Sequence, residues 1–448
     1  MFSKEQFFFF IFIAISVLII GGVLFGINSN IFHYRDRNIE NTLALSATAI
    51  ISAFPSPSPD PTPTPIPPPQ KLENPPEIAK AVYVTGYSAG SKKYLDYLSN
   101  LFKNTEINAV VVNIKEDDGH ISYNSGAEEV KKYKLYNGAI KDIDALIRFF
   151  HGKNIYVIGR MVVFQDPTYS KIRPDLAIYS KASLTQSLTY SGPTLWKNNK
   201  GLTWLDPTAT GAWDYNISIA KDALLHGFDE INFDYIRFPS DGNVKDAGFH
   251  FWGAESTKAG VLKNFFEYTR KELAGEKISV DLFGQTTTNT DDMGIGQVIE
   301  NAFENFDYIS PMVYPSHYIN GFLGFDNPSE HPYEIVKYSM ATALNRENVF
   351  LKKIEDAISK SYQPVESSSL DLQAPLFTPT PPLSPSVVLA KFRPWLQDFN
   401  MGAVYNSEMV KAEIRATKDA LGENYAGYML WNASNIYTQG AVLKNAGN

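Results

Sequence analysis

The sequence contains no cysteine, and this absence excludes several kinds of chemistry. Without thiols the chain can form no disulfide, no cysteine nucleophile and no cysteine-ligated zinc or iron–sulfur site. Histidine is also scarce, with seven residues and neither a His-x-His nor a His-Glu-x-x-His pattern, which argues against a catalytic zinc. We therefore expect neither a cofactor nor a resident metal.

Basic residues are also fewer than acidic residues. With 40 Lys and Arg against 48 Asp and Glu, the formal net charge is −8, so nucleic acid is not an expected partner. Aromatic residues make up 13% of the chain, which suits a cleft that stacks on sugar rings. A large aromatic core would give the same composition.

A single long apolar run, residues 7–27, contains no charged residue. As a helix it would span roughly 30 Å, the thickness of the bilayer hydrocarbon, and it exceeds the about 7–15 residues of a signal-peptide core. The nearest cleavage site, Ala47-Thr48-Ala49, lies far downstream. We expect an uncleaved transmembrane helix that anchors a single-pass protein in the cell membrane, with the folded part extracytoplasmic. Cleavage would make the protein secreted.

Two Pro-rich stretches divide the rest of the chain. Residues 55–69 carry proline at nearly every second position, which predicts an extended polyproline II spacer, and residues 378–386 are similar. The expected organisation is a membrane anchor at 1–30, a disordered linker at 31–76, and one folded domain at 77–448 with a disordered insertion at 355–390. A boundary between two domains at the insertion is the alternative.

Strand-like runs alternate with amphipathic helical runs from residue 81 onward. This pattern predicts an α/β fold with a parallel sheet, and eight strands favour closure into a (β/α)8 TIM barrel that lacks a good eighth helix. A doubly wound open sheet is the alternative, but no Gly-rich phosphate turn follows the first strand. The predicted strands are 82–87, 109–115, 155–164, 230–238, 278–284, 308–315, 392–399 and 427–433, and the predicted helices are 91–104, 140–152, 211–226, 258–275, 295–306, 332–346 and 407–421.

The segment 228–239 has one apolar and one polar face. Ile231 and Phe233 lie on the first, whereas Asn232 and Asp234 lie on the second. In a barrel the apolar face packs on helices, and the inward tip of the strand carries chemistry. The same reading of every strand, with Val- and Ile-rich faces outward, places an inward polar set near the rim: Thr85, Tyr87, Asn113, Lys115, Arg160, Asp234, Asp281, Tyr314, Arg393, Gln397 and Asn432.

Two of these residues, Asp234 and Asp281, end neighbouring strands, which lie about 4.8 Å apart in a sheet. One protonated carboxyl group can give its proton to a leaving oxygen while an ionised one acts as nucleophile or as base for water. We expect Asp234 to be the nucleophile or stabiliser and Asp281 the general acid/base. Glu230 shares the inward face but lies at the buried end of its strand, so it is the poorer candidate.

Further polar and aromatic residues at the strand ends are expected to bind substrate. The two arginines would hold carboxylates ionised or bind acidic substituents of a sugar, and Asp398 would orient hydroxyl groups. The expected substrate-binding set is Tyr87, Lys115, Asp117, Arg160, Arg237, Tyr314, His317, Gln397, Asp398, Trp431 and Asn432.

Several sequence blocks resemble the bacterial family of glycoside-hydrolase-like domains formerly listed as domain of unknown function 4015. They occur in one order over about 79–434, at 82–90, 113–119, 159–164, 228–242, 280–284, 291–296, 308–317, 393–398 and 429–433. The resemblance implies a TIM barrel of the glycosidase superfamily. Asp234, Asp281 and Asp398 match the acids of strands four, five and seven in the α-amylase-type layout, although strand five of that layout has a glutamate.

The leading hypothesis is therefore a membrane-anchored glycoside hydrolase that acts on an envelope or extracellular polysaccharide. A non-catalytic carbohydrate-binding barrel at the cell surface is the second hypothesis. The third is a metal-dependent hydrolase that uses Glu116, Asp117 and Asp234, because hard oxygen ligands suit Ca²⁺ or Mg²⁺.

Overall fold

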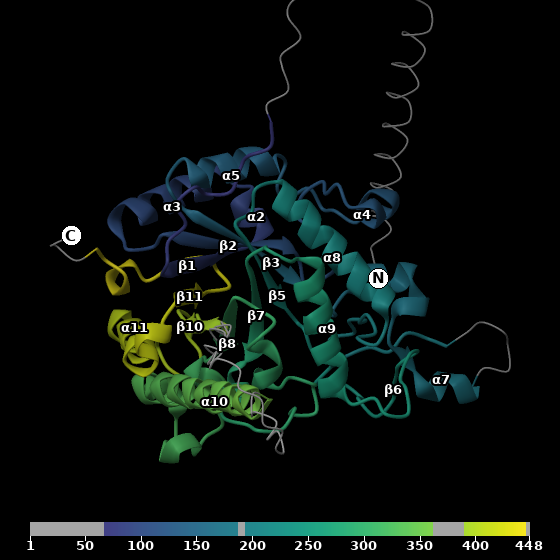
Figure 1. The fold of residues 1–448 in the computed structure, drawn as a ribbon. Helices are drawn as coiled ribbons and strands as arrows, with labels where there is room; N and C mark the ends of the chain where they lie inside the picture. The colour runs from purple at the N-terminus through teal and green to yellow at the C-terminus, as the bar shows by residue number, and fades with distance from the viewer. Residues whose placement is uncertain (1–66, 187–192, 362–388, 445–448) are drawn as a thin grey trace, which may run out of the picture. The chain divides into compact units, whose positions relative to one another are not determined.

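The computed structural model describes residues 67–186, 193–361 and 389–444 (Figure 1). These residues belong to one compact unit that begins at Pro67. The predicted membrane anchor, the linker up to residue 66 and the second Pro-rich stretch lie outside the described residues. Within the described ranges, no helix combines the length and the apolar character needed to cross a membrane.

Eight parallel strand positions form a closed barrel. Seven are single strands: β1 (Ala79–Val84), β2 (Ala109–Lys115), β3 (Tyr156–Val162), β5 (Glu230–Asp234), β7 (Ile278–Phe283), β8 (Tyr308–Met312) and β11 (Gly427–Trp431). The seventh position in chain order is shared by β9 (Lys391–Phe392) and β10 (Trp395–Gln397), which both pair with β8, and β10 also pairs with β11 to close the ring. The predicted TIM barrel is confirmed.

Proline explains the break in the seventh strand. Pro394 stands between β9 and β10, and because proline has no backbone N–H it cannot donate to the ladder. The pairing resumes at once, with Trp395 opposite Met312 on one side and Met429 on the other. The barrel therefore closes in spite of the gap.

Helices surround the barrel, as Figure 1 shows. The main ones are α3 (Lys92–Asn104), α5 (Ile143–His151), α8 (Thr210–Leu225), α9 (Lys258–Glu272), α10 (Pro332–Ser361) and α11 (Ser407–Leu421). Shorter elements lie in the loops: α2 (Gly86–Ala89), α4 (Glu128–Tyr133), α6 (Tyr169–Ile172), α7 (Lys181–Gln186), and β4 (Tyr179–Ser180), which pairs antiparallel with β6 (Ala247–Gly248). The 3-10 turns are η2 (Pro174–Leu176), η3 (Gly284–Thr287), η4 (Ile299–Ala302), η5 (Pro315–His317), η6 (Phe322–Gly324), η7 (Pro328–Glu330), η8 (Gly422–Asn424) and η9 (Gln439–Ala441).

Local sequence sets where these helices begin and which side they bury. Asp142, Thr257 and Asn406 precede α5, α9 and α11, and each side chain accepts a hydrogen bond from a backbone N–H of the first turn. In α3, Leu98, Leu101 and Phe102 recur at helical spacing and are buried against the barrel. The helices therefore cover the Val- and Ile-rich outer face of the strands.

The inside of the barrel is filled by a separate cluster of side chains. Small residues on β1 and β2, such as Ala81 and Ala109, leave room for the larger Tyr156 and Trp395. Below them, the buried Arg393 guanidinium pairs with Glu230, which also accepts hydrogen bonds from Ser279 and Tyr156. This network engages Arg393 at the N-terminal end of the barrel, where β5 begins with Glu230, so Arg393 does not reach the rim where the inward pattern had placed it.

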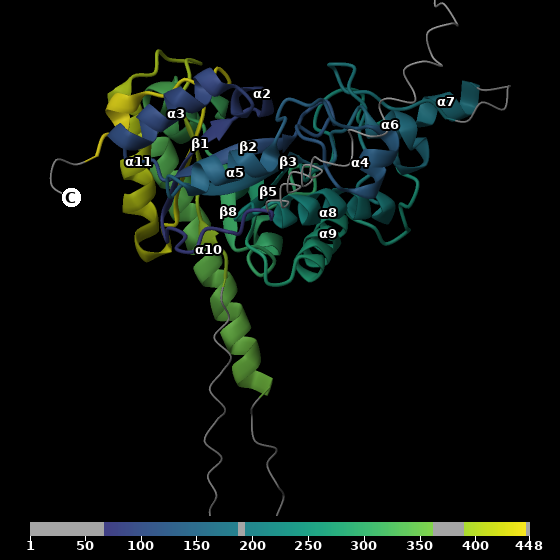
Figure 2. The same cartoon turned by 90° about the horizontal axis from the view of Figure 1, so that it is seen from above.

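Several predicted boundaries are wrong, for local reasons. The first strand ends at Val84 rather than at residue 87, because α2 begins at Gly86. The predicted helix 295–306 is only the turn η4, which follows two glycines with positive φ, Gly294 and Gly296. Helix α10 continues to residue 361 and projects from the barrel in Figure 2, so it includes the first residues of the predicted insertion; residues 362–388 lie outside the described part.

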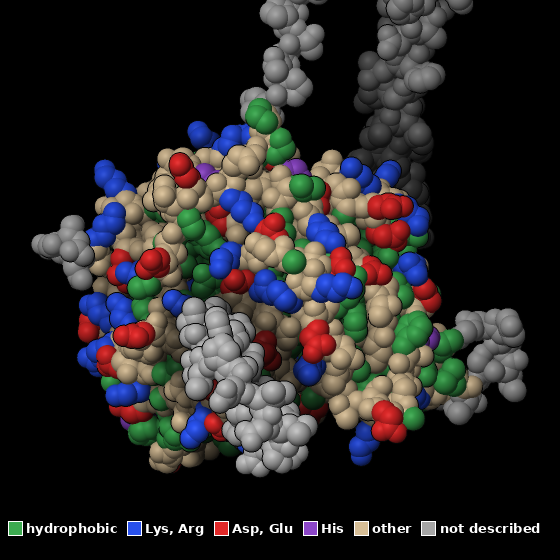
Figure 3. Space-filling model, in the orientation of Figure 1, with side chains coloured by type: hydrophobic (Ala, Val, Ile, Leu, Met, Phe, Trp, Pro, Cys, Tyr) green, Lys and Arg blue, Asp and Glu red, His purple; other side chains and the backbone are tan. Residues whose placement is uncertain are grey.

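Acidic and basic side chains are interspersed over the face of the molecule that Figure 3 presents. Neither sign gathers into a broad area there. This face therefore sets up no strong field of one sign, in keeping with the modest net charge of the chain.

Candidate active site

Asp234 is placed by a tight turn at the end of β5. Tyr235 follows in the left-handed region, with φ 54°, and its N–H donates to Asp234 Oδ1 at 2.6 Å. This conformation is costly for a residue other than glycine, and such strain clusters at functional sites. The turn ends the strand four residues earlier than predicted and leaves the Asp234 carboxylate at the C-terminal rim.

Arg160, on β3, holds the Asp234 carboxylate from the neighbouring strand. Its Nε donates to Asp234 Oδ2 at 3.1 Å, its Nη2 contacts the same oxygen, and its Nη1 donates to Asn113 Oδ1 at 2.6 Å. The guanidinium also lies over the rings of Tyr83 and Trp431. Arg160 is 4% exposed, so its charge acts on Asp234 with little screening by solvent.

Asp281, on β7, is the second carboxyl group near Arg160. Asn232 donates to its Oδ1 at 2.8 Å, and its Oδ2 lies 3.9 Å from Arg160 Nε. Burial, and then the charge of Asp234, raise the pKa of Asp281 well above its ordinary value, which Arg160 and Asn232 only partly oppose. Asp281 therefore retains its proton to a higher pH than an exposed aspartic acid.

The two carboxyl groups lie close to each other. Asp234 Oδ2 and Asp281 Oδ2 are 3.1 and 3.9 Å from one nitrogen, Arg160 Nε, so the two oxygens are at most 7.0 Å apart. Paired carboxyl groups that cleave glycosides are about 5–9.5 Å apart, depending on the stereochemical outcome. The upper limit of 7.0 Å is compatible with this range, and Asp281 is the member of the pair whose pKa is raised.

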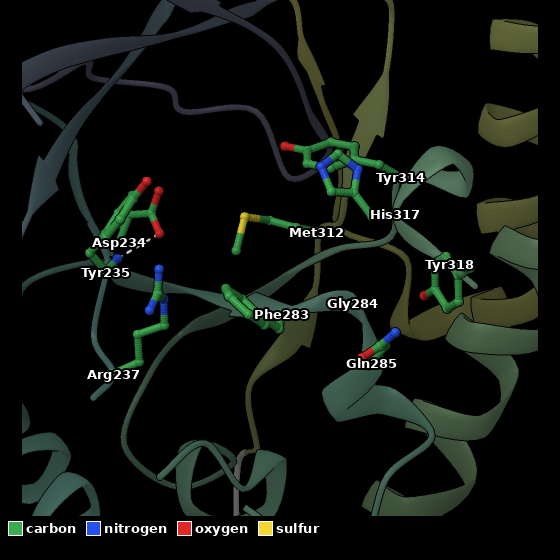
Figure 4. Close-up of a pocket in the computed structure, with 10 residues that line it drawn as sticks. All are labelled: Asp234, Tyr235, Arg237, Phe283, Gly284, Gln285, Met312, Tyr314, His317 and Tyr318. Carbon is green, nitrogen blue, oxygen red and sulfur yellow. Dashed lines mark hydrogen bonds between the residues drawn. The ribbon is translucent and has the colours of Figure 1, made fainter. Parts of the chain in front are cut away.

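A cavity of about 330 Å³ opens beside Asp234. We call it the Arg237 cavity; it lies among the residues that follow β5, β7 and β8, and its ten lining residues are labelled in Figure 4. Asp234, Tyr235 and Arg237 form one side of it, and Tyr314 and His317 lie across from them with Phe283 and Met312 between. Burial lowers the pKa of His317, which is therefore neutral near pH 7.

A second cavity, of about 380 Å³, lies on the other side of Arg160. We call it the Trp431 cavity, and its lining includes Tyr83, Tyr87, Asn113, Glu116, Asp117 and Trp431. Tyr83 and Trp431 pack with ring centroids 4.1 Å apart. Arg160 thus links Asp234, in the lining of the Arg237 cavity, to Asn113, Tyr83 and Trp431, in the lining of the Trp431 cavity.

Asp117 is exposed at the mouth of the Trp431 cavity. The protein atoms around it desolvate the carboxyl group and raise its pKa; Arg160 opposes this rise and Asp234 adds to it. Asp117 is thus electrostatically coupled to the Asp234–Arg160 pair while remaining open to solvent. The neighbouring Glu116 instead accepts hydrogen bonds from Gly86 N and Ser122 Oγ at 3.1 and 3.0 Å.

Lys115 does not reach the site, contrary to prediction. A β-bulge between Asn113 and Lys115 shifts the register against β3, so Lys115 stands opposite Met161. The side chain turns outward and is fully buried, with Nζ 2.8 Å from Asp166 Oδ2 and 2.9 Å from Asn216 Oδ1. It therefore ties β2 to the residues after β3 and to α8 instead of binding substrate.

Three further predicted substrate ligands are engaged in holding loops together. Gln397 donates from Nε2 to Phe399 O at 3.0 Å and accepts from Ser316 N at 3.2 Å. Both carboxylate oxygens of Asp398 accept from Thr438, and Asn432 accepts from Ser434 and donates to Ile436 O. Neither cavity lining includes these three side chains, so the structure does not support a substrate contact for them.

Two other arrangements can be judged from the described residues. No group of three or more His, Asp or Glu side chains there is arranged to hold a metal ion.

The spacing of a serine-hydrolase elbow occurs once, at Gly86-Tyr87-Ser88-Ala89-Gly90. However, Ser88 lies inside α2 without positive φ, and its Oγ is 3.0 Å from Thr85 Oγ1. The geometry does not make Ser88 a nucleophile.

A parallel barrel that carries paired carboxyl groups at the C-terminal ends of neighbouring strands has the layout of glycosidases. Over residues 81–360 and 353–437 the sequence matches the family DUF4015, whose description reads "Putative glycosyl hydrolase domain". The chain belongs to this family, and its fold is a TIM barrel.

Solved structures resemble this chain as well. A hypothetical protein from Ruminiclostridium thermocellum is 37% identical, with 48% of this chain and 98% of that one covered and a TM-score of 0.40. The PgaB (BpsB) glycoside hydrolase domain from Bordetella bronchiseptica is 13% identical over 80% and 95%, with a TM-score of 0.49. The α-galactosidase TtGalA from Thermus thermophilus is 12% identical over 84% and 65%, with a TM-score of 0.42. Comparison with curated proteins gave no match.

Some lining residues were not predicted from the sequence. Tyr83 and Phe283 share the inward face with Tyr87 and Asp281, so the period-two pattern contains a signal for both. Tyr235 lines the cavity from a turn in which its φ is positive, and the sequence pattern gives no sign of that turn.

Proposed function

We propose that this protein hydrolyses glycosidic bonds of an envelope or extracellular polysaccharide. The observation that carries the proposal is the pair of carboxyl groups, Asp234 and Asp281, within reach of the single guanidinium of Arg160 beside an open cavity. We further propose that the apolar run 7–27, which is long enough to span a bilayer as a helix, anchors the chain in the cell membrane with the barrel on the extracytoplasmic side.

Each carboxyl group has a distinct role in this proposal. Asp234, which pairs with Arg160, lines the cavity and either attacks the anomeric carbon or stabilises its positive charge while water attacks. Asp281, with its raised pKa, supplies the proton that the glycosidic oxygen takes up as the bond to the sugar breaks. Asp281 is only 1% exposed and lines neither cavity. Asp117 lines the Trp431 cavity, is exposed and also has a raised pKa, which makes it the competing proton donor.

A hydrolysis assay tests the function directly. The purified full-length chain is incubated with a panel of envelope and extracellular polysaccharides, and new reducing ends are counted. We expect release from at least one acidic or neutral polysaccharide. Binding to a polysaccharide without any release of reducing ends would instead support the non-catalytic surface barrel.

A comparison of leaving groups identifies the proton donor. The variant that lacks the donor is expected to lose about 10²–10⁴-fold in kcat/KM on a natural glycoside, but little on a dinitrophenyl glycoside, whose leaving group needs no proton. We expect this signature for Asp281→Asn. If Asp117→Asn shows it and Asp281→Asn does not, the donor is Asp117 and Asp281 only positions Arg160.

A further inference from the structure

Three arginines are buried among the described residues, and one of them lacks a carboxylate partner. Arg160 pairs with Asp234 and Arg393 with Glu230, whereas Arg237 makes no ion pair within the described part of the chain. Arg237 is only 8% exposed. A guanidinium remains charged in proteins, and a buried charge is costly unless it is paired.

The protein contacts of Arg237 use only part of its donor capacity. Nη1 donates to Phe238 O and to Ser240 Oγ, both at 3.2 Å, and no described residue accepts from Nε or Nη2. The guanidinium lies about 5 Å from the ring centres of Trp204, Tyr235 and Phe283, which fix its position. The structure thus holds a rigid cation in place and leaves hydrogen-bond donors free.

These free donors face the Arg237 cavity. Arg237 is among its lining residues, and in Figure 4 its guanidinium stands on the same side as Asp234. Asp234 forms no hydrogen bond with Arg237; its Oδ2 accepts from Arg160 and its Oδ1 from Tyr235 N. The charges of Asp234 and Asp241 interact with Arg237 electrostatically, without a hydrogen bond.

We propose that the Arg237 cavity binds a sugar unit that carries an oxyanion, which makes the substrate an acidic polysaccharide. The planar fork of a guanidinium matches a carboxylate or a sulfate ester with two parallel hydrogen bonds. The remaining wall supplies neutral groups: Tyr314, His317 and Gln285 offer hydrogen bonds to hydroxyl groups, and Phe283 offers an apolar face. This inference rests on the proposed function for its substrate class.

A binding experiment tests the inference without depending on turnover. The full-length chain carrying Asp234→Asn is titrated with uronic-acid oligosaccharides as free acids and as methyl esters, and with sulfated oligosaccharides and their desulfated forms. The members of each pair share one sugar skeleton and differ at the charged group, so the loss of the affinity ratio in an Arg237 variant measures recognition of the oxyanion. The carboxylate and sulfate pairs separate the two sources of that charge.

We expect at least one charged oligosaccharide to bind tenfold or more tightly than its neutral counterpart, since hydrogen bonds to charged groups are the strong ones. Arg237→Met should reduce this ratio to about one, and Arg237→Lys, which keeps the charge but loses the fork, should fall between. Arg415→Met is the matched control, because it removes an exposed guanidinium that stacks on Tyr333 outside the cavity. Arg237→Lys also serves if Arg237→Met does not fold.

The outcomes are separable from those of the hydrolysis assay. Equal affinity for charged and neutral partners, no binding to any charged oligosaccharide, or an equal loss for both members of a pair in Arg237→Met would each overturn the inference. If charged oligosaccharides bind through Arg237 but the wild-type chain cleaves none of them, the inference stands and the proposed hydrolysis fails.

Discussion

Asp234→Asn is expected to lower kcat/KM on the cleaved polysaccharide by about 10³-fold or more. The substitution keeps the size of the side chain but removes the negative charge that would attack or stabilise the anomeric carbon, and carboxylates in this role are worth several orders of magnitude in rate. The loss should appear in kcat rather than in KM, because the interaction forms in the transition state. Initial rates of reducing-end release measure both.

The fold of this variant should survive. Burial, and then the charge of Asp234, raise the pKa of Asp281, so removing that charge lowers the pKa and favours ionisation of Asp281 beside Arg160. Arg160 also keeps its hydrogen bond to Asn113 Oδ1. Asp96→Asn, an exposed position on α3, is the matched control and should retain wild-type rates. Wild-type turnover by a folded Asp234→Asn protein would remove Asp234 from the mechanism.

The alternation of polar and apolar residues predicts much of the barrel. It locates all eight strand positions, because each strand packs one face on helices and the other into the barrel. The same alternation brings Arg160, Asp234 and Asp281 to one place, since neighbouring parallel strands present matching inward positions. These three residues sit in regular stretches of strand, where period two holds.

The pattern fails where the backbone departs from regular geometry or where polar groups bind distant loops. The bulge before Lys115 reverses its face, and the positive φ of Tyr235 redirects the residues that lead to Arg237. Asp398 satisfies both oxygens with Thr438, which is 40 positions away in the sequence. Periodicity within one strand contains no information on such partners.

Lys115→Met tests whether the Lys115 side chain faces away from the site, as the structure has it, or into the site, as the sequence pattern predicts. If Lys115 bound substrate, the variant would raise KM and leave stability nearly unchanged. In the structure the substitution leaves the buried carboxylate of Asp166 without its cationic partner. Breaking a buried ion pair in this way typically costs about 3–5 kcal/mol of unfolding free energy. Urea unfolding followed by circular dichroism measures this cost.

The pH dependence of stability and a double variant test whether the unpaired Asp166 carboxylate causes the destabilisation of Lys115→Met. Burial raises the pKa of Asp166 and Lys115 opposes that rise, so in Lys115→Met the folded-state pKa should climb further above the unfolded value. A raised carboxyl pKa favours folding at low pH, and this contribution is lost as pH rises through the folded pKa. The loss of unfolding free energy in Lys115→Met should therefore be smaller at pH 5 than at pH 8.

The double variant Lys115→Met/Asp166→Asn removes the unpaired charge and keeps an acceptor for Tyr169 N. It should recover most of the stability. An unchanged deficit in the double variant would mean that lost packing around Lys115, rather than the stranded charge, sets the cost.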